Sequence, residues 1–162
     1  MSETARLVQE LEREHAGDPW HGSSVTDILK GVSAAEAASR VLPGVHTIWE
    51  IVLHMTAWKN EASQRLTGAP AGDPQEGDWP QTGAPTPERW YDTLQRLDAA
   101  HIALVAAVRD LPESRLLEPV NDLRDRAAGT GQSLYVLLHG IVQHDAYHAG
   151  QIAMLVRAIR PR

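Results

Sequence analysis

The segment that most limits how this chain can fold is residues 68–85, which contain four glycines and four prolines. Proline lacks a backbone N–H and glycine loses the most conformational freedom on folding, so such a segment forms neither a helix nor a central strand. The sequence on either side carries apolar residues at helical spacing. A loop of this length inside a compact domain is unusual, and we expect it to be either functional or a crossover connection.

Recognisable capping signals mark where the helical segments begin. Thr47 with Glu50 three residues later forms a capping box, in which each side chain can satisfy the other residue's free backbone amide. Thr86 followed by Pro87 is a cap with proline in the first turn, and Ser133 is a cap for the last apolar segment. We predict four long helices, over residues 3–15, 47–66, 86–111 and 133–159. We also expect short helical elements after Ser24 and after Ser33.

Four long helices with a long connection in the middle favour a bundle with a crossover over simple up-and-down neighbours. We therefore expect an all-α fold, a four-helix bundle with a long crossover loop between helices 2 and 3. Residues 112–132 are expected to be irregular. At 162 residues and 43% hydrophobic content, the chain fits a single domain, residues 1–162, with a sizeable core.

Composition excludes several classes of function. The net charge of -6 argues against nucleic acid as a partner, because its binding depends on a basic face. The chain has no cysteine, so it has no thiolate ligand or nucleophile, and thiol chemistry would need a small-molecule cosubstrate. The N-terminus lacks the pattern of a signal peptide, and no run approaches the length of a membrane span. We expect a cytoplasmic protein with no membrane partner.

Three histidines form a candidate metal site. His144 and His148 are four residues apart in a helical segment, so both lie on one face and can hold one divalent cation. His54 lies inside the largely apolar segment of residues 46–58. Buried imidazoles without partners are costly, and a shared metal would explain all three. The alternative is that each is a core histidine bonded to a carbonyl or hydroxyl group.

Other polar residues near these segments are weaker candidates for proton transfer or substrate orientation. Glu50 and Glu61 lie near the His54 face, but Glu50 has a capping role and we expect Glu61 to be a solvated charge. His21 lies in a loop rich in glycine and serine. Tyr147 and Gln151 flank the histidine pair and could orient ligands or substrate.

Several motifs resemble the DinB-like (DinB/YfiT) superfamily of metal-dependent four-helix bundles, and the resemblance covers essentially the whole chain. They are Trp20-His21-Gly22, the segment from Pro43 to Glu50 with His54, and above all His144-Asp-Ala-Tyr147-His148-Ala-Gly150-Gln151-Ile152. The resemblance implies that the metal ligands are His54, His144 and His148. The sequence departs from the family where many members carry a tryptophan before the cap of the second helix, because His46 stands there. We expect His46 to be an exposed neighbour of the cap, the alternative being an extra polar group near the site.

The resemblance also implies a chemistry. Characterised members of the family are thiol S-transferases or isomerases that use bacillithiol, mycothiol or glutathione, typically with zinc or nickel, and many form homodimers. Three neutral imidazoles would leave the charge of the ion undiminished, so a bound thiol would be held as thiolate. The first hypothesis is a metal-dependent transferase that joins a low-molecular-weight thiol to a small electrophile. The alternatives are a metal-dependent hydrolase of small esters or amides, and a non-catalytic metal-binding protein related to stress.

Overall fold

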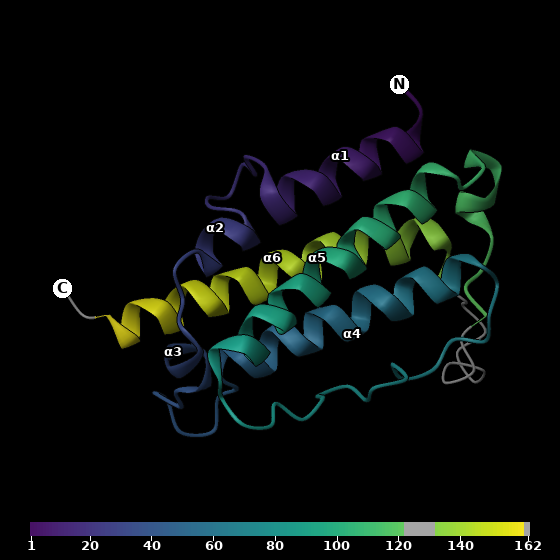
Figure 1. The fold of residues 1–162 in the computed structure, drawn as a ribbon. Helices are drawn as coiled ribbons and strands as arrows, with labels where there is room; N and C mark the ends of the chain where they lie inside the picture. Colours follow the sequence, from purple (N-terminus) through teal and green to yellow (C-terminus); the bar gives the residue numbers. More distant parts are fainter. Residues whose placement is uncertain (122–131, 161–162) are drawn as a thin grey trace.

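The computed structural model describes residues 1–121 and 132–160 (Figure 1). The described part of the chain contains no β-strand, only one isolated bridge between Pro119 and Ser133. Its elements are, in chain order, the helices α1 (Glu3–Ala16), α2 (Val25–Leu29), α3 (Ala34–Ala38), α4 (Ile48–Leu66) and α5 (Pro87–Arg109), the 3₁₀ helix η1 (Glu113–Leu117) and the helix α6 (Leu134–Ile159).

The four long helices form a bundle in which α4 packs against α5 and α6, and α1 packs against α5 and α6. Figure 1 shows that α1 and α6 run in one direction, whereas α4 and α5 run in the other. Because α4 and α5 are consecutive long helices and parallel, residues 67–86 return along the length of the bundle between them. This arrangement confirms the prediction of a four-helix bundle with a crossover between its second and third long helices.

The helix limits follow the capping signals. The Thr47 hydroxyl accepts from the Glu50 amide while the Glu50 carboxylate accepts from the Thr47 amide, and α3 begins with the same reciprocal pair at Ser33. Beyond the end of α4, Gly68 has a φ of +87°, a left-handed conformation that favours glycine. Helix α5 ends at Arg109, two residues before the predicted limit at Leu111, whose side chain is buried just beyond the helix.

The segment of residues 112–132 is less irregular than we predicted, because η1 occupies part of it. Pro112 precedes the first turn of η1, where its missing N–H leaves no intrahelical bond unmade. Backbone hydrogen bonds between Val120 and Gln132, and between Leu134 and Glu118, join the two ends of the segment. The remainder of this prediction, over residues 122–131, lies outside the described residues.

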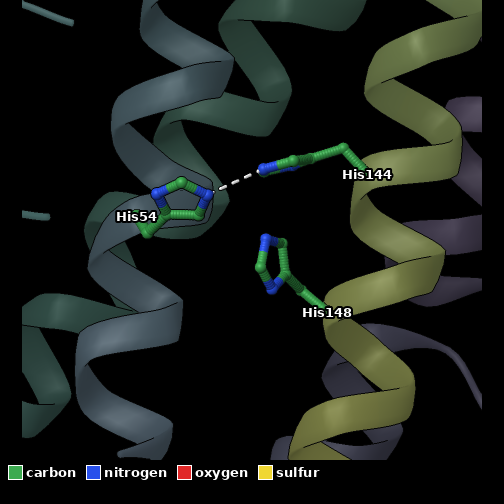
Figure 2. A group of neighbouring side chains, drawn as sticks. All are labelled: His54, His144 and His148. Carbon is green, nitrogen blue, oxygen red and sulfur yellow. Dashed lines mark hydrogen bonds between the residues drawn. The ribbon is translucent and has the colours of Figure 1, made fainter. Parts of the chain in front are cut away.

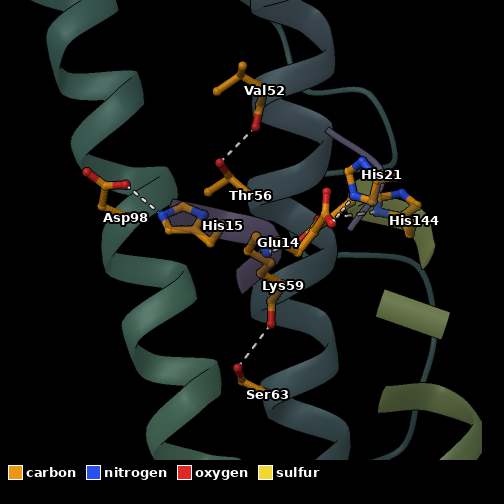
Figure 3. A network of polar contacts seen from close by, with 10 residues as sticks. Glu14, His15, His21, Val52, Thr56, Lys59, Ser63, Asp98 and His144 are labelled. Atoms are coloured by element: carbon orange, nitrogen blue, oxygen red, sulfur yellow. Dashed lines mark hydrogen bonds and ion pairs between the residues drawn. The ribbon is translucent and has the colours of Figure 1, made fainter. Parts of the chain in front are cut away.

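The buried apolar side chains form two clusters, one toward each end of the bundle. On α4 the first cluster ends at Met55 and the second begins at Ala62. The polar residue Lys59 lies between them and is fully buried. Similar positions on the other long helices hold buried polar groups, and we call the whole set the buried polar layer: Glu14, His15, Lys59, His101 and Asp145. Figure 3 shows three of its members, Glu14, His15 and Lys59. One member of this layer, Asp145, directly follows the candidate histidine His144 in the sequence.

No helix in the part of the chain that the structure describes combines the length and the apolarity required to cross a lipid bilayer.

Candidate metal centre

Helices α4 and α6 bring the three predicted histidines together. His54 projects from α4 toward α6, and His144 and His148 project from consecutive turns of α6 (Figure 2). Each ring offers one nitrogen, and these three nitrogens all lie within 4.8 Å of one another. The Nε2 atoms of His54 and His144 are 2.9 Å apart. Side chains 90 residues apart in the chain therefore converge on one point of the interhelical contact.

The spacing of these nitrogens fits one tetrahedral cation. Two nitrogens that each bind zinc at about 2.1 Å in a tetrahedron lie about 3.4 Å apart. The 2.9 Å between Nε2 of His54 and Nε2 of His144 is slightly shorter than that, and the upper limit of 4.8 Å for the group is somewhat longer. The imidazole rings would have to move for all three nitrogens to reach one ion at this distance. Three protein ligands would leave a fourth position for another ligand.

Burial keeps two of these rings neutral. His54 and His148 are only 6% and 5% exposed. Burial is the largest cause that lowers the pKa of His148, to about 4, and it also lowers the pKa of His54. Near pH 7 both imidazoles therefore carry a nitrogen lone pair, which is the form that binds a metal ion.

Hydrogen bonds select which nitrogen of these two rings carries the proton. His54 Nδ1–H donates to the backbone carbonyl oxygen of Asp78 at 2.6 Å, and His148 Nδ1–H donates to Oε1 of Gln151 at 2.7 Å. A carbonyl oxygen only accepts, so the lone pair of each ring is on Nε2. Ligating histidines in proteins are held by partners of this kind, which fix the orientation of the ring.

Residues 67–86, the crossover segment, include side chains that cover the His54 side of the cluster. The indole ring of Trp79 stacks on His54, with centroids 4.0 Å apart, and His46 stacks on the same indole at 3.5 Å. Asp78 is anchored as well, since its Oδ1 accepts a hydrogen bond of 2.8 Å from Nε1 of Trp58. His46 is thus exposed, as expected, and it also supports the aromatic cover of the site.

Glu50 and Tyr147 are two of the weaker candidates for proton transfer or substrate orientation. Glu50 is engaged by Thr47, Arg40 and His46. Burial raises the pKa of its carboxyl, but the Thr47 amide and Arg40 lower it more, so Glu50 is ionised and held at the start of α4. Tyr147 is 65% exposed, and its ring contacts His148 edge-on at 5.1 Å.

His21 is exposed and hydrogen-bonded through Nε2 to Glu14, whose side chain is buried (Figure 3). The expectation that Glu61 is a solvated charge was wrong. Its carboxylate is only 11% exposed, and its Oε1 accepts from Nε of Arg65 and from the backbone amide of Gly72. Glu61 therefore ties the start of the crossover segment to α4.

Sequence reasoning missed Asp78 and the buried pair of Lys59 and Asp145. Asp78 lies in the crossover segment, where no periodicity reports which atoms face a helix. The pair did leave a signal. Lys59 is four residues after the buried Met55, and Asp145 is four residues after the buried Ile141, so two opposite charges fall on the apolar faces of two packed helices.

A sequence comparison supports the arrangement of helices and histidines. The family model described as the DinB superfamily matches residues 20–152, which include all three histidines of the cluster. Among curated proteins and among solved structures, none matches the chain.

Proposed function

The chain belongs to the DinB superfamily, and from this membership and the site geometry we propose that it is a metal-dependent transferase. It would bind one zinc or nickel ion through His54, His144 and His148, and would join a low-molecular-weight thiol of the bacillithiol, mycothiol or glutathione type to a small electrophile. The observation that carries the proposal is the convergence of three imidazole nitrogens within 4.8 Å, with two of the rings already oriented through Nδ1.

The donor set favours a thiolate as the fourth ligand. Three neutral imidazoles do not offset the charge of a divalent ion, and imidazole suits both zinc and nickel. When bound, the ion would supply a positive charge that lowers the pKa of a thiol and holds its sulfur as thiolate. The chain has no cysteine of its own, so this sulfur must come from a cosubstrate.

The chain's own residues would orient the reactants. Asp78 and Gln151 hold the ligand rings in place, while Trp58, Trp79 and Tyr147 present aromatic surface around the cluster. In the transfer, the sulfur forms a bond to an electrophilic carbon, a leaving group departs with its electron pair, and the thiol proton goes to solvent. Aromatic rings around the cluster favour an electrophile with an apolar body.

Metal analysis of single variants tests the metal site. The native chain should bind one zinc or nickel ion per protomer, and His148→Ala should bind at least tenfold more weakly because it removes a ligand. His139→Ala is the matched control, since this histidine is also on α6 but its ring contacts Tyr135 and its Nδ1 faces Glu10. A native chain that holds no ion after reconstitution, or a His148→Ala variant that binds like the control, would refute the site.

Substrate turnover separates transfer from the alternatives. With metal bound, conjugation of 1-chloro-2,4-dinitrobenzene should require an added thiol and should be lost in His148→Ala. Turnover of p-nitrophenyl acetate without any thiol would instead support a hydrolase. Stoichiometric metal with neither activity, across the three thiols, would contradict the transferase and support a non-catalytic metal-binding protein.

A further inference from the structure

An ion pair is enclosed in the bundle beside the candidate metal centre. Lys59 on α4 is 0% exposed and Asp145 on α6 is 1% exposed, and the Lys59 ammonium donates to Oδ2 of Asp145. Removing two charges from water is costly, and replacing a buried ion pair with apolar residues is often neutral or stabilising. Fold stability is therefore a poor explanation for the pair, which calls for a role at the adjoining site.

The second oxygen of Asp145 faces one of the three histidines. Oδ1 of Asp145 lies 3.9 Å from Nδ1 of His144. Both atoms are buried, and neither has a hydrogen-bond partner among the described residues. A distance of 3.9 Å is too long for a hydrogen bond, but a shift of about 1 Å would bring the two atoms to the usual separation.

The other two histidines show what such a contact does. Nδ1 of His54 and Nδ1 of His148 each donate to an oxygen, and this leaves Nε2 free to bind an ion. His144 needs the same arrangement, and Oδ1 of Asp145 is the buried oxygen beside its Nδ1. We propose that Asp145 is the positioning residue of His144, accepting its Nδ1 hydrogen while Lys59 holds the carboxylate in place. This inference rests on the proposed metal site.

The contact between His54 and His144 gives the proposal a second consequence. Because His54 donates through Nδ1, its Nε2 can only accept, so the 2.9 Å contact is a hydrogen bond when His144 carries its proton on Nε2. His144 Nδ1 then has no hydrogen for Asp145, which accounts for the two unpaired atoms. With an ion bound at Nε2 of His144, the ring would carry its hydrogen on Nδ1, and Oδ1 of Asp145 would accept it.

The variant Asp145→Asn tests this assignment. Lys59 offers only donors, so the amide oxygen of the new side chain will face Lys59 and its NH₂ group will face Nδ1 of His144. That arrangement favours the form of His144 that carries its proton on Nε2. In that form Nε2 has no free lone pair and cannot bind Zn²⁺. Competition with a chelator should show that affinity for Zn²⁺ falls between about 10- and 100-fold. Nitrogen NMR of the zinc-loaded native chain should show His144 protonated on Nδ1.

Two further variants separate positioning from folding. The double variant Lys59→Met with Asp145→Leu removes both charges, so it should keep a cooperative fold and still bind Zn²⁺ at least about tenfold more weakly than the native chain. Glu10→Gln is the matched control and should bind like the native chain, since Glu10 faces His139 and not a ligand.

The outcomes distinguish the two proposals. If the native chain binds Zn²⁺ and both Asp145 variants bind it within about twofold of the native affinity, the positioning role is refuted and the metal site stands. If Asp145→Asn does not fold, the double variant decides in the same way. If the native chain binds no Zn²⁺ at all, the positioning role and the metal site are both refuted.

Discussion

Acid should destabilise this protein through its buried polar layer, and the contribution of His101 can be isolated. Burial, followed by the charges of His15 and Lys59, lowers the pKa of His101 from 6.5 to about 3. Between these two values the unfolded chain binds a proton that the native chain does not bind. The stabilisation is therefore fully present above pH 6.5 and is lost progressively as the pH falls toward 3.

The magnitude follows from the separation of the two pKa values. At pH 5 the imidazole is protonated in the unfolded chain and still neutral in the native one. Because pH 5 is 1.5 units below the unfolded pKa and each unit corresponds to about 1.4 kcal/mol, His101 alone removes about 2 kcal/mol from the free energy of unfolding between pH 7 and pH 5. Small domains are stable by about 5–15 kcal/mol, so this loss is readily measured.

Urea denaturation at pH 7 and pH 5 provides the assay. The native chain should lose about 2 kcal/mol more between the two pH values than His101→Gln, whose remaining dependence includes that of His15, a residue whose pKa burial and Lys59 also lower. His139→Gln is the control and should behave as the native chain, since His139 lies outside the layer. An equal loss in the native chain and in His101→Gln would show that His101 is not kept neutral by burial.

Two further perturbations test the support of the site and the start of α4. Gln151→Leu removes the acceptor of His148 Nδ1 and should weaken Zn²⁺ binding about tenfold in a chelator competition. Gln151→Glu keeps an acceptor and should bind Zn²⁺ with close to the native affinity. Equal binding by the two variants would contradict the orienting role of Gln151. Thr47→Ala removes the cap of α4 and should lower the free energy of unfolding by about 1 kcal/mol. The melting temperature, followed by circular dichroism, should fall by about 3 °C. The control is Thr67→Ala at the opposite end of the helix, and an equal change in both variants would count against the cap.

The fold and the three histidines could be predicted because both depend on local patterns. The caps at Thr47 and Ser133 set where α4 and α6 begin, and the spacing of His144 and His148 places them on one face wherever the helix lies. His54 meets these two residues because α4 packs against α6, and the apolar character of both helices favoured that contact. Local periodicity thus sufficed to place His144 and His148 on one face, whereas the approach of His54 required the packing of α4 on α6.

The parts that could not be predicted depend on contacts without a local pattern. Nothing in the sequence around Asp78 and Trp79 tells which of their atoms meet His54, because the path of a loop is fixed by tertiary contacts such as those of Trp58. Lys59 and Asp145 are different, because a charged residue on an apolar helical face predicts a buried partner. The identity of that partner still required the packing of α4 on α6.

The parallel course of α4 and α5 has a consequence for the length of the connection between them. A helix of 19 residues is about 28 Å long, and an extended chain at about 3.3 Å per residue covers that distance with fewer than ten residues. Residues 67–86 thus provide much more chain than the return requires. The extra length lets the backbone turn toward His54 at Asp78. Homologous chains with the shortest possible connection would keep the topology but lose the contacts of Asp78 and Trp79 with His54.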